Sequence, residues 1–186
     1  MNRCLWVNEK NEKYIKYHDE EWCEPKHNDK ELYELLILES FQAGLSWECV
    51  LNKRKAFRKA YDNFDIDKVI NYDSSKINEL LNNKDIIRNK LKVNASITNS
   101  KVFKDIVKEY GSFNNYIWSF TNNKVLYLDY EIIKNDLSDK ISKDLIKRGM
   151  KFVGTTIIYS YLQAIGIINS HHKNCFKYKE DIWKKD

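Results

Sequence analysis

The segment NDKELYELLILESFQAGLSWECVL, residues 28–51, decides the fold class because it encodes two helices joined by a short turn. Leucines recur at helical spacing within residues 30–43, after a capping residue at Asn28 or Asp29. A second helix is predicted from Trp47 onward, and its buried positions are Val50, Leu51, Phe57 and Tyr61. Two helices joined in this way are typical of a helical core.

Helical spacing continues through most of the chain outward from this segment. Further helices are predicted over residues 74–81, 87–110, 112–120, 138–148 and 155–166, and residues 121–137 are assigned to a loop with some β-like alternation. The chain has one proline and five glycines, which argues against a β-sandwich punctuated by turns. We therefore predict an all-α fold in a single unit, residues 1–186.

Composition limits the classes of protein to consider. The 186 residues are 42% hydrophobic, enough for a buried core, and no apolar run approaches the ~18 residues of a membrane span. The N-terminal residues lack the apolar region of a signal peptide, so we expect a cytoplasmic protein with no membrane partner. Nothing indicates an oligomer, and we expect a monomer. A net charge of +5 permits a nucleic-acid partner without indicating one.

A carboxylate interrupts the apolar face of the first strong helix. Leu32, Leu35 and Leu36 define that face, and the next position along it is Glu39. Burying a bare carboxylate costs several kcal/mol, so Glu39 either turns out to water at the helix end or faces a pocket. The following QAGLSW turn carries Trp47, and an acid beside such an aromatic turn favours a pocket.

Cysteines and histidines near the two chain ends suggest a metal site. Cys4 pairs with His18 near the N-terminus, and His171 pairs with Cys175 at helical spacing near the C-terminus. Two cysteines and two histidines make a closed tetrahedral zinc set. Two alternatives remain: the cysteines are small buried hydrophobes, or the adjacent His172 exchanges roles with His171. The other two thiols, those of Cys23 and Cys49, are predicted to lie in the core.

Six colinear motifs resemble the 3-methyladenine DNA glycosylase I family. They are RCLWV (3–7), YIKYHDEEW (14–22), LESFQAGLSW (38–47), IIRNKLK (86–92), KRGMKFVGTT (147–156) and HHKNC (171–175). The resemblance runs from residue 3 to about residue 175. This chain departs from the family's common pattern at Cys23, Ser40 and Ser170. These departures leave the expected pocket and metal residues in place.

The resemblance implies a helix–hairpin–helix glycosylase fold, with a helical core over about residues 28–166. A terminal subdomain, residues 1–27 with 167–186, would be joined by one structural zinc ion on Cys4, His18, His171 and Cys175. The implied reaction is hydrolysis of the N-glycosidic bond of 3-methyladenine in alkylated double-stranded DNA, a step of base-excision repair. The implied base pocket consists of Glu39 with Tyr14, Tyr17, Trp22, Trp47 and the nearby Trp6.

The residues themselves refine that chemistry. A flipped, cationic base needs aromatic faces and a negative group, so Trp47 and Tyr14 would sandwich the ring while Glu39, the catalytic candidate, accepts hydrogen bonds from it. In helix–hairpin–helix glycosylases with lyase activity, a Schiff-base lysine stands where this chain has Thr156. No acid occurs between Leu145 and Lys179, so the usual catalytic aspartate is absent. We expect hydrolysis without strand cleavage.

DNA contacts are expected from three places. The backbone of Gly154, Thr155 and Thr156 opens a helix and would bind a phosphate. Leu45 is either a wedge into the base stack or a core residue. The third is a run of basic residues that is either a DNA-binding or a solvated helix face: Lys53, Arg54, Lys55, Arg58 and Lys59.

Several assignments stay open on the residues alone. Arg88 and Lys92 are structural or directed at phosphate, and Trp118 and Trp183 are predicted to be packing residues. The main alternative function is a zinc-stapled DNA-binding module without catalysis, which would need neither Glu39 nor the aromatic pocket. A zinc hydrolase is disfavoured because four protein ligands leave no open position for water.

Overall fold

The computed structural model describes residues 1–178, and Trp183, predicted to pack, lies outside them. The helical elements are α1 (Glu12–Lys16), the π-helical turn η1 (Tyr17–Glu21), α2 (Asp29–Gln42), α3 (Trp47–Ala60), the 3-10 turn η2 (Asp62–Phe64), α4 (Ile66–Val69), α5 (Ser74–Asn82), α6 (Lys90–Tyr110), α7 (Phe113–Ser119), α8 (Asp136–Lys147) and α9 (Thr155–Ala164). The strands are β1 (Leu126–Tyr127) and β2 (Ile168–Asn169). No helix in this part of the chain is long and apolar enough to cross a membrane.

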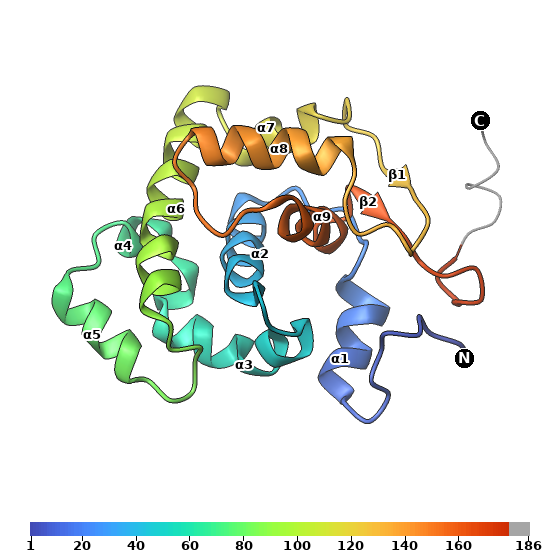
Figure 1. The fold of residues 1–186 in the computed structure, drawn as a ribbon, viewed down its shortest axis with the longest axis horizontal. Helices are drawn as coiled ribbons and strands as arrows, with labels where there is room; N and C mark the ends of the chain where they lie inside the picture. The colour runs from blue at the N-terminus through green and yellow to red at the C-terminus, as the bar shows by residue number, and fades with distance from the viewer. Residues whose placement is uncertain (179–186) are drawn as a thin grey trace.

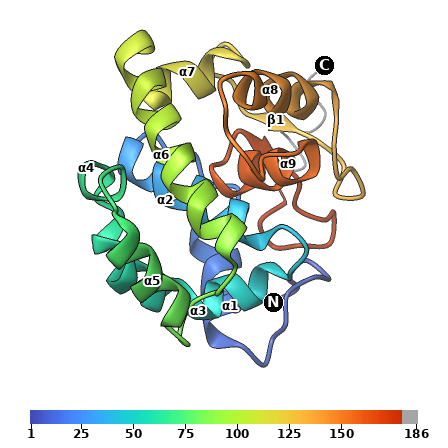
Figure 2. The same cartoon turned by 60° about the vertical axis from the view of Figure 1, so that its left-hand side comes forward.

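Helix α2 is the centre of the molecule. It begins where predicted, because the side chain of Asn28 accepts hydrogen bonds from the first-turn amides, and every residue from Leu32 to Phe41 is buried. Helices α3, α6, α7 and α9 pack around it, as Figures 1 and 2 show from two sides. A helix enclosed on all sides buries its polar residues too, which is why Glu39 sits inside the protein.

The predicted helix boundaries agree with the observed ones to within a few residues. Where a helix start differs from the prediction, a capping side chain determines the observed position. Helix α6 starts at Lys90, later than expected, because Asn89 accepts from the amide of Lys92; Gly111, at φ +80°, ends it as predicted. Helix α8 starts two residues early, because Asn135 and Ser138 form a reciprocal capping box.

Two short strands correct the prediction of an all-α fold. Residues 121–137 contain β1, which pairs in parallel with β2 in the register Leu126 to Ile168 and Tyr127 to Asn169. This pairing joins the loop before α8 to the segment after α9. The protein is therefore mostly helical, with one small parallel pair beside the C-terminal segment.

The loop between α8 and α9 is held tightly from two neighbouring helices. Asn99 on α6 exchanges two hydrogen bonds of 2.8 Å with the backbone of Lys151, and Ser142 on α8 donates to the carbonyl of Val153 at 2.7 Å. Phe152, between them, has a left-handed backbone at φ +56°. The backbone at this position therefore has a conformation that favours glycine, although a phenylalanine occupies it.

Candidate functional site

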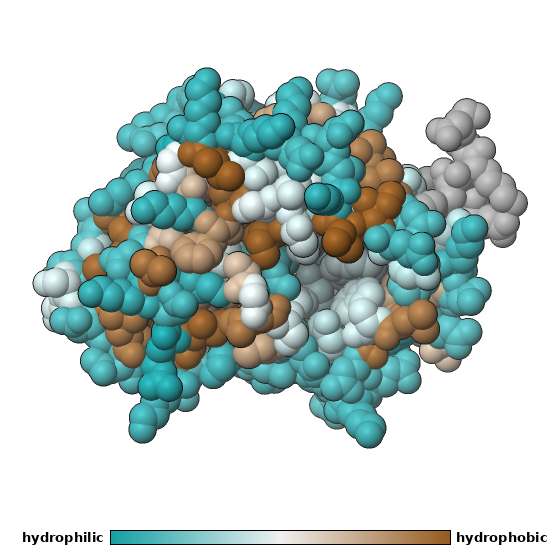
Figure 3. All heavy atoms as spheres, in the orientation of Figure 1, coloured by the Kyte–Doolittle hydropathy of each residue, from teal (hydrophilic) through white to brown (hydrophobic). Residues whose placement is uncertain are grey.

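One cavity of about 510 Å³ lies between the N-terminal elements, the end of α2 and helix α9. In the space-filling view it is the hollow right of centre (Figure 3). Its walls come from segments far apart in the sequence, and they consist of Leu5, Trp6, Tyr14, Tyr17, Trp22, Glu39, Gln42, Trp47, Tyr130, Ile132, Ile133, Thr156, Tyr159, Ser160, Gln163, Ser170 and His172. The set includes the predicted acid and every predicted pocket aromatic.

Glu39 faces the cavity from the last turns of α2. Its side chain does not reach bulk water, since the residue is 3% exposed, and its Oε2 has no hydrogen-bond partner in the described structure. Burial raises the pKa of this carboxyl to about 8, because no neighbouring cation or donor offsets the cost of the charge. The interpretation in which Glu39 turns out to solvent is therefore wrong.

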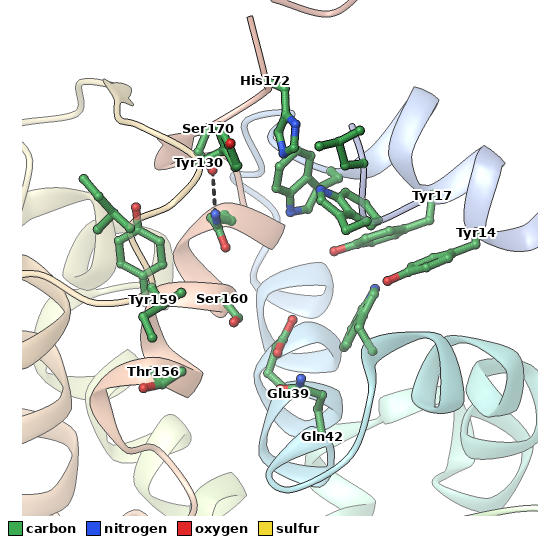
Figure 4. Close-up of a pocket in the computed structure, with 17 residues that line it drawn as sticks. Tyr14, Tyr17, Glu39, Gln42, Tyr130, Thr156, Tyr159, Ser160, Ser170 and His172 are labelled. Atoms are coloured by element: carbon green, nitrogen blue, oxygen red, sulfur yellow. Dashed lines mark hydrogen bonds between the residues drawn. The ribbon is translucent and has the colours of Figure 1, made fainter. Parts of the chain in front are cut away.

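Five aromatic side chains, the aromatic cage, form the wall facing Glu39. The cage consists of Trp6, Tyr14 on α1, Tyr17 on η1, Trp22 and Trp47 on α3. Ring centroids are 5.3 Å apart for Tyr17 and Trp47, 5.1 Å for Trp6 and Tyr14, and 4.8 Å for Trp6 and Trp22. In the close-up, the hydroxyls of Tyr14 and Tyr17 point toward the space above Glu39 (Figure 4).

Both tyrosines remain protonated at neutral pH. Burial raises the pKa of Tyr14 to about 12, with smaller contributions from the charges of Glu48 and Glu39. Burial also holds the pKa of Tyr17 well above its ordinary value, and Glu39 adds to that effect. Each hydroxyl can therefore donate a hydrogen bond as well as accept one.

Unpartnered polar atoms gather in this cavity. Among the described residues, the buried side-chain atoms without a hydrogen-bond partner are Oε2 of Glu39, Oε1 of Gln42, Nε1 of Trp47 and the hydroxyl of Tyr159. All four residues line the cavity. Because leaving such groups unpaired costs free energy, the arrangement favours a ligand that carries both donors and acceptors.

Helix α9 supplies a wall that the sequence prediction missed. Thr156, Tyr159, Ser160 and Gln163 follow helical spacing and turn toward the cavity, as Figure 4 shows for the first three. The sequence indicated an apolar helix here, and this polar stripe was overlooked. Thr156, predicted to help bind a phosphate, lines the cavity instead of lying wholly outside it.

The start of α9 has no side-chain cap. Gly154 is the N-cap residue and supplies no side-chain acceptor for the first-turn amides. The hydroxyl of Thr155 lies 2.8 Å from that of Ser138, so this side chain is already engaged. The first-turn N–H groups of α9 are thus the ones available to an anion.

A second cluster, the metal cluster, combines the four predicted ligands. The donor atoms of Cys4, His18, His171 and Cys175 all lie within 4.8 Å of one another, and all four residues are buried. Sulfur–nitrogen distances are 3.4 Å from Cys175 to His18, 3.5 Å from Cys4 to His171 and 3.6 Å from Cys175 to His171. Tetrahedral zinc bonds would place sulfur and nitrogen about 3.6 Å apart, so the donor set fits that ion.

Polar groups around the metal cluster hold its side chains in place. Nδ1 of His18 lies 2.7 Å from Asp19, and Arg3 donates to both oxygens of that carboxylate. The backbone amides of His172 and Lys177 point at the sulfurs of Cys4 and Cys175 at 3.5 Å and 3.4 Å. A carboxylate behind a ligating histidine and amides on sulfur are typical of a structural metal site. The histidine that belongs to the cluster is His171, since His172 instead stacks on Tyr130 with centroids 3.7 Å apart.

The turn between α2 and α3 projects Leu45 outward. Leu45 is 40% exposed, so the interpretation in which it packs in the core is wrong. The ammonium of Lys92 donates to the carbonyls of Phe41 at 2.8 Å and Ala43 at 2.5 Å, which fixes the end of α2 just before this turn. Lys92 is therefore structural.

Two of the five basic residues predicted on α3 are engaged in ion pairs. Arg54 is bonded to Glu34 at 2.5 Å and to Glu21 at 2.6 Å, and Arg58 pairs with Glu34 at 2.8 Å. Neither alternative, a DNA-binding face or a purely solvated one, describes these arginines. Among the remaining assignments, Trp118 and Cys23 are buried as predicted, whereas the prediction for Cys49 is wrong because it is only half-buried.

Known proteins are similar to this chain over nearly its full length. A family model described as methyladenine glycosylase matches residues 6–178. DNA-3-methyladenine glycosylase 1 of Escherichia coli is 38% identical over 96% of this chain and 97% of its own length. DNA-3-methyladenine glycosylase of Haemophilus influenzae is 36% identical over 93% of this chain and 96% of its own.

A solved structure is also similar to this chain over nearly its full length. It describes 3-methyladenine recognition by 3-methyladenine DNA glycosylase I of Staphylococcus aureus, superimposes with a TM-score of 0.90 and has 34% sequence identity. The match covers 96% of this chain and 98% of the other.

Proposed function

This chain belongs to the methyladenine glycosylase family, and from that membership we propose that it excises 3-methyladenine from alkylated DNA in base-excision repair. The reaction is monofunctional hydrolysis: the bond between the base and C1′ of the sugar breaks, and its electron pair leaves with the base. Water adds to C1′ and loses a proton, which leaves an abasic site. The strand stays intact.

The buried Glu39 opposite an aromatic cage is the observation that carries this proposal. N3-methylation makes adenine cationic in DNA and weakens its bond to the sugar. A cavity that offers one carboxyl and several aromatic faces favours that cation over an unmodified base, with aromatic contributions of about 0.5–2 kcal/mol each. The unpartnered atoms of Glu39, Gln42 and Trp47 supply acceptors and a donor for the base edge.

The protonation of Glu39 couples to the charge of the base. With its pKa at about 8, the carboxyl of the empty cavity is mainly neutral at pH 7. A cationic base entering the same desolvated space offsets the burial cost and favours the carboxylate. Binding therefore releases a proton from Glu39 and creates an ion pair that an unmodified adenine cannot make.

The composition of the cavity supports hydrolysis without lyase chemistry. No lysine lines it within residues 1–178, so no amine is placed to form a Schiff base with the sugar. Glu39 is its one acidic residue in the same part of the chain. Catalysis then rests on binding a labile cationic leaving group, with Glu39 as the group that contacts it.

DNA would be held by the uncapped start of α9 and by Leu45. The amides after Gly154 would bind a phosphate of the damaged strand, and the exposed Leu45 would enter the base stack as the lesion turns out. Both lie at the edges of segments that also line the cavity. A flipped base would thus travel a short path from the duplex to Glu39.

One structural zinc ion would occupy the metal cluster. The sulfur–nitrogen distances of 3.4–3.6 Å and the buried donor set fit tetrahedral coordination by four protein ligands. Such a site has no open position for water, so the ion supplies folding stability. It would join the segment before α2 to the segment after α9.

Chromatography of the bases released from methylated DNA tests the proposal. Incubation with the wild-type protein should release free 3-methyladenine without strand cleavage. Glu39→Ala should remove most of that release, whereas Lys68→Ala, on the exposed surface of α4, should not change it. Duplex binding with no released base would overturn the proposal that the protein is an enzyme. It would favour the zinc-stapled DNA-binding module, which does not need the cavity.

A further inference from the structure

The residues that lead into α6 form an exposed segment beside the α8–α9 loop. Ile86 is buried and anchors this segment, and Asn89 caps the helix, so the backbone between them is fixed at both ends. Arg88, Asn89, Lys90 and Leu91 are all exposed. The Arg88–Leu91 segment is thus a rigid projection from the surface.

Arg88 differs from every other arginine of the protein. Arg3, Arg54, Arg58 and Arg148 each form ion pairs with one or two carboxylates. Arg88 has no ion pair and no side-chain hydrogen bond within residues 1–178, although the protein has 27 acidic residues. An exposed arginine without a protein partner is free to bind an external anion.

Leu91 is an unusually exposed aliphatic side chain at 72%. It borders a groove of about 330 Å³ that is closed on the other side by Lys151 and Phe152 of the α8–α9 loop. On the adjacent helical position, Lys92 is bonded to the carbonyls of Phe41 and Ala43. The Arg88–Leu91 segment is therefore held in a fixed place relative to both the α8–α9 loop and the turn that carries Leu45.

The residues that line this groove include one charged side chain, Lys151, and no acid. No acidic residue occurs between Ile86 and Lys104 or between Leu145 and Lys179. These two stretches, which flank the groove, bring Arg88, Lys90 and Lys151 to the surface. Such a face is complementary to a polyanion.

We propose that the Arg88–Leu91 segment is an additional DNA-binding element beside the damaged nucleotide. Arg88 binds a backbone phosphate, and Leu91 contacts the sugar and base edges of the duplex next to the Leu45 wedge. Its function is to hold the distorted duplex while the base is turned out. The inference rests on the proposed function and deepens it, because it names residues that recognise DNA rather than the base.

Binding of a labelled undamaged duplex across a salt series tests Arg88. Arg88→Ala should weaken binding several-fold at low salt and reduce the slope of log affinity against log salt by about 1. Arg88→Lys should keep the slope, since the charge remains. Lys68→Ala on α4 is the control for loss of one surface charge and should leave the slope unchanged. A slope for Arg88→Ala equal to that of wild type would overturn the proposal.

Excision from double-stranded and single-stranded methylated DNA tests Leu91. Leu91→Ala should lower the rate on the duplex several-fold and leave the rate on single strands unchanged, because only the duplex must be distorted. Leu91→Met should restore the duplex rate. Equal rates for Leu91→Ala and wild type on the duplex would overturn the role of this residue.

The same samples separate this inference from the proposed function. Quenching of tryptophan fluorescence by free 3-methyladenine should be unchanged in every variant, since neither residue lines the cavity. Release of 3-methyladenine by the wild type together with unaffected variants would overturn the inference alone. No release by the wild type would overturn the proposed function, whatever the variants do to duplex binding.

Discussion

Trp22 lies edge-on against His171, with ring centroids 4.7 Å apart and planes at 85°. The same indole lines the cavity and packs against Trp6 of the aromatic cage. Trp22 therefore lies at the boundary between the metal cluster and the cavity, as does Trp6, which packs edge-on against His18 with centroids 5.4 Å apart. The aromatic cage is therefore in contact with the segment that joins the chain ends, although the four residues of the metal cluster do not line the cavity.

Removing the proposed zinc ion should damage the cavity as well as the fold. Chelation, or the variant Cys175→Ala, is expected to lower the free energy of unfolding by several kcal/mol, because the segment after α9 loses its attachment. The loss of Trp22 packing should also abolish quenching of tryptophan fluorescence by 3-methyladenine. Cys49→Ala is the control, since that thiol lies outside the metal cluster. Unchanged stability and quenching after complete chelation would contradict the role of the cluster.

The sequence indicated the metal cluster and the pocket to different extents. Two cysteines and two histidines near the chain ends suggested one zinc set from the residues alone, with His172 left as an alternative to His171, whereas the resemblance supplied the aromatic cage. Tyr14 and Tyr17 lie on a short helix and a π-helical turn, which hydrophobic spacing does not reveal. The cavity wall on α9 was missed because Ile157 and Ile158 between its polar positions make the whole segment appear apolar.

Replacing Glu39 with glutamine should stabilise the protein at pH values above 4.5, the ordinary pKa of a glutamate carboxyl. The folded carboxyl has a pKa of about 8 against an ordinary 4.5, so between these values the folded state holds a proton that the unfolded state has lost. The free energy of unfolding of the wild type therefore falls as pH rises through this window, by up to about 1.4 kcal/mol per pH unit. Glu39→Gln removes that decline.

Urea unfolding across the pH range measures this effect. The two proteins should have similar stability at or below pH 4.5, and Glu39→Gln should be the more stable at pH 8. Its affinity for 3-methyladenine should fall, because an amide cannot become the partner of a cationic base. Equal pH profiles for the two proteins would show that Glu39 does not carry a buried proton.

Arg54 holds together three of the elements that carry the cavity. Its guanidinium binds Glu21 of η1 at 2.6 Å and Glu34 of α2 at 2.5 Å, while Arg54 itself lies on α3. Arg54→Met should lower the free energy of unfolding by about 2–4 kcal/mol, because it leaves a nearly buried Glu34 with less compensation. Arg58→Met is the matched control and should cost less than about 1 kcal/mol, since Arg58 is 46% exposed. Equal losses of stability would contradict a special role for Arg54.

This ion-pair network shows a limit of sequence reasoning. Lys53, Arg54, Lys55, Arg58 and Lys59 look alike as a basic stripe on one helix. Carboxylates from η1 and α2 pair with Arg54 and Arg58 only, so the packing of three separate elements distinguishes these arginines from the lysines beside them. Helix boundaries, in contrast, follow from local caps such as Asn28, which is why most of them could be predicted within a few residues.

Substitution of Gly166 tests the contact between the end of α9 and the segment that precedes α2. Its backbone is left-handed at φ +77°, and a Cβ atom there would collide with the backbone of Glu24 and Pro25. Gly166→Ala should therefore cost more than about 3 kcal/mol, combining left-handed strain with a clash that no side-chain movement relieves. Gly154→Ala is the matched control: nothing lies within 4 Å of its Cβ position and its φ is −61°. That variant should change thermal unfolding by less than about 1 kcal/mol, and a similar result for Gly166→Ala would show that the two segments are not in close contact.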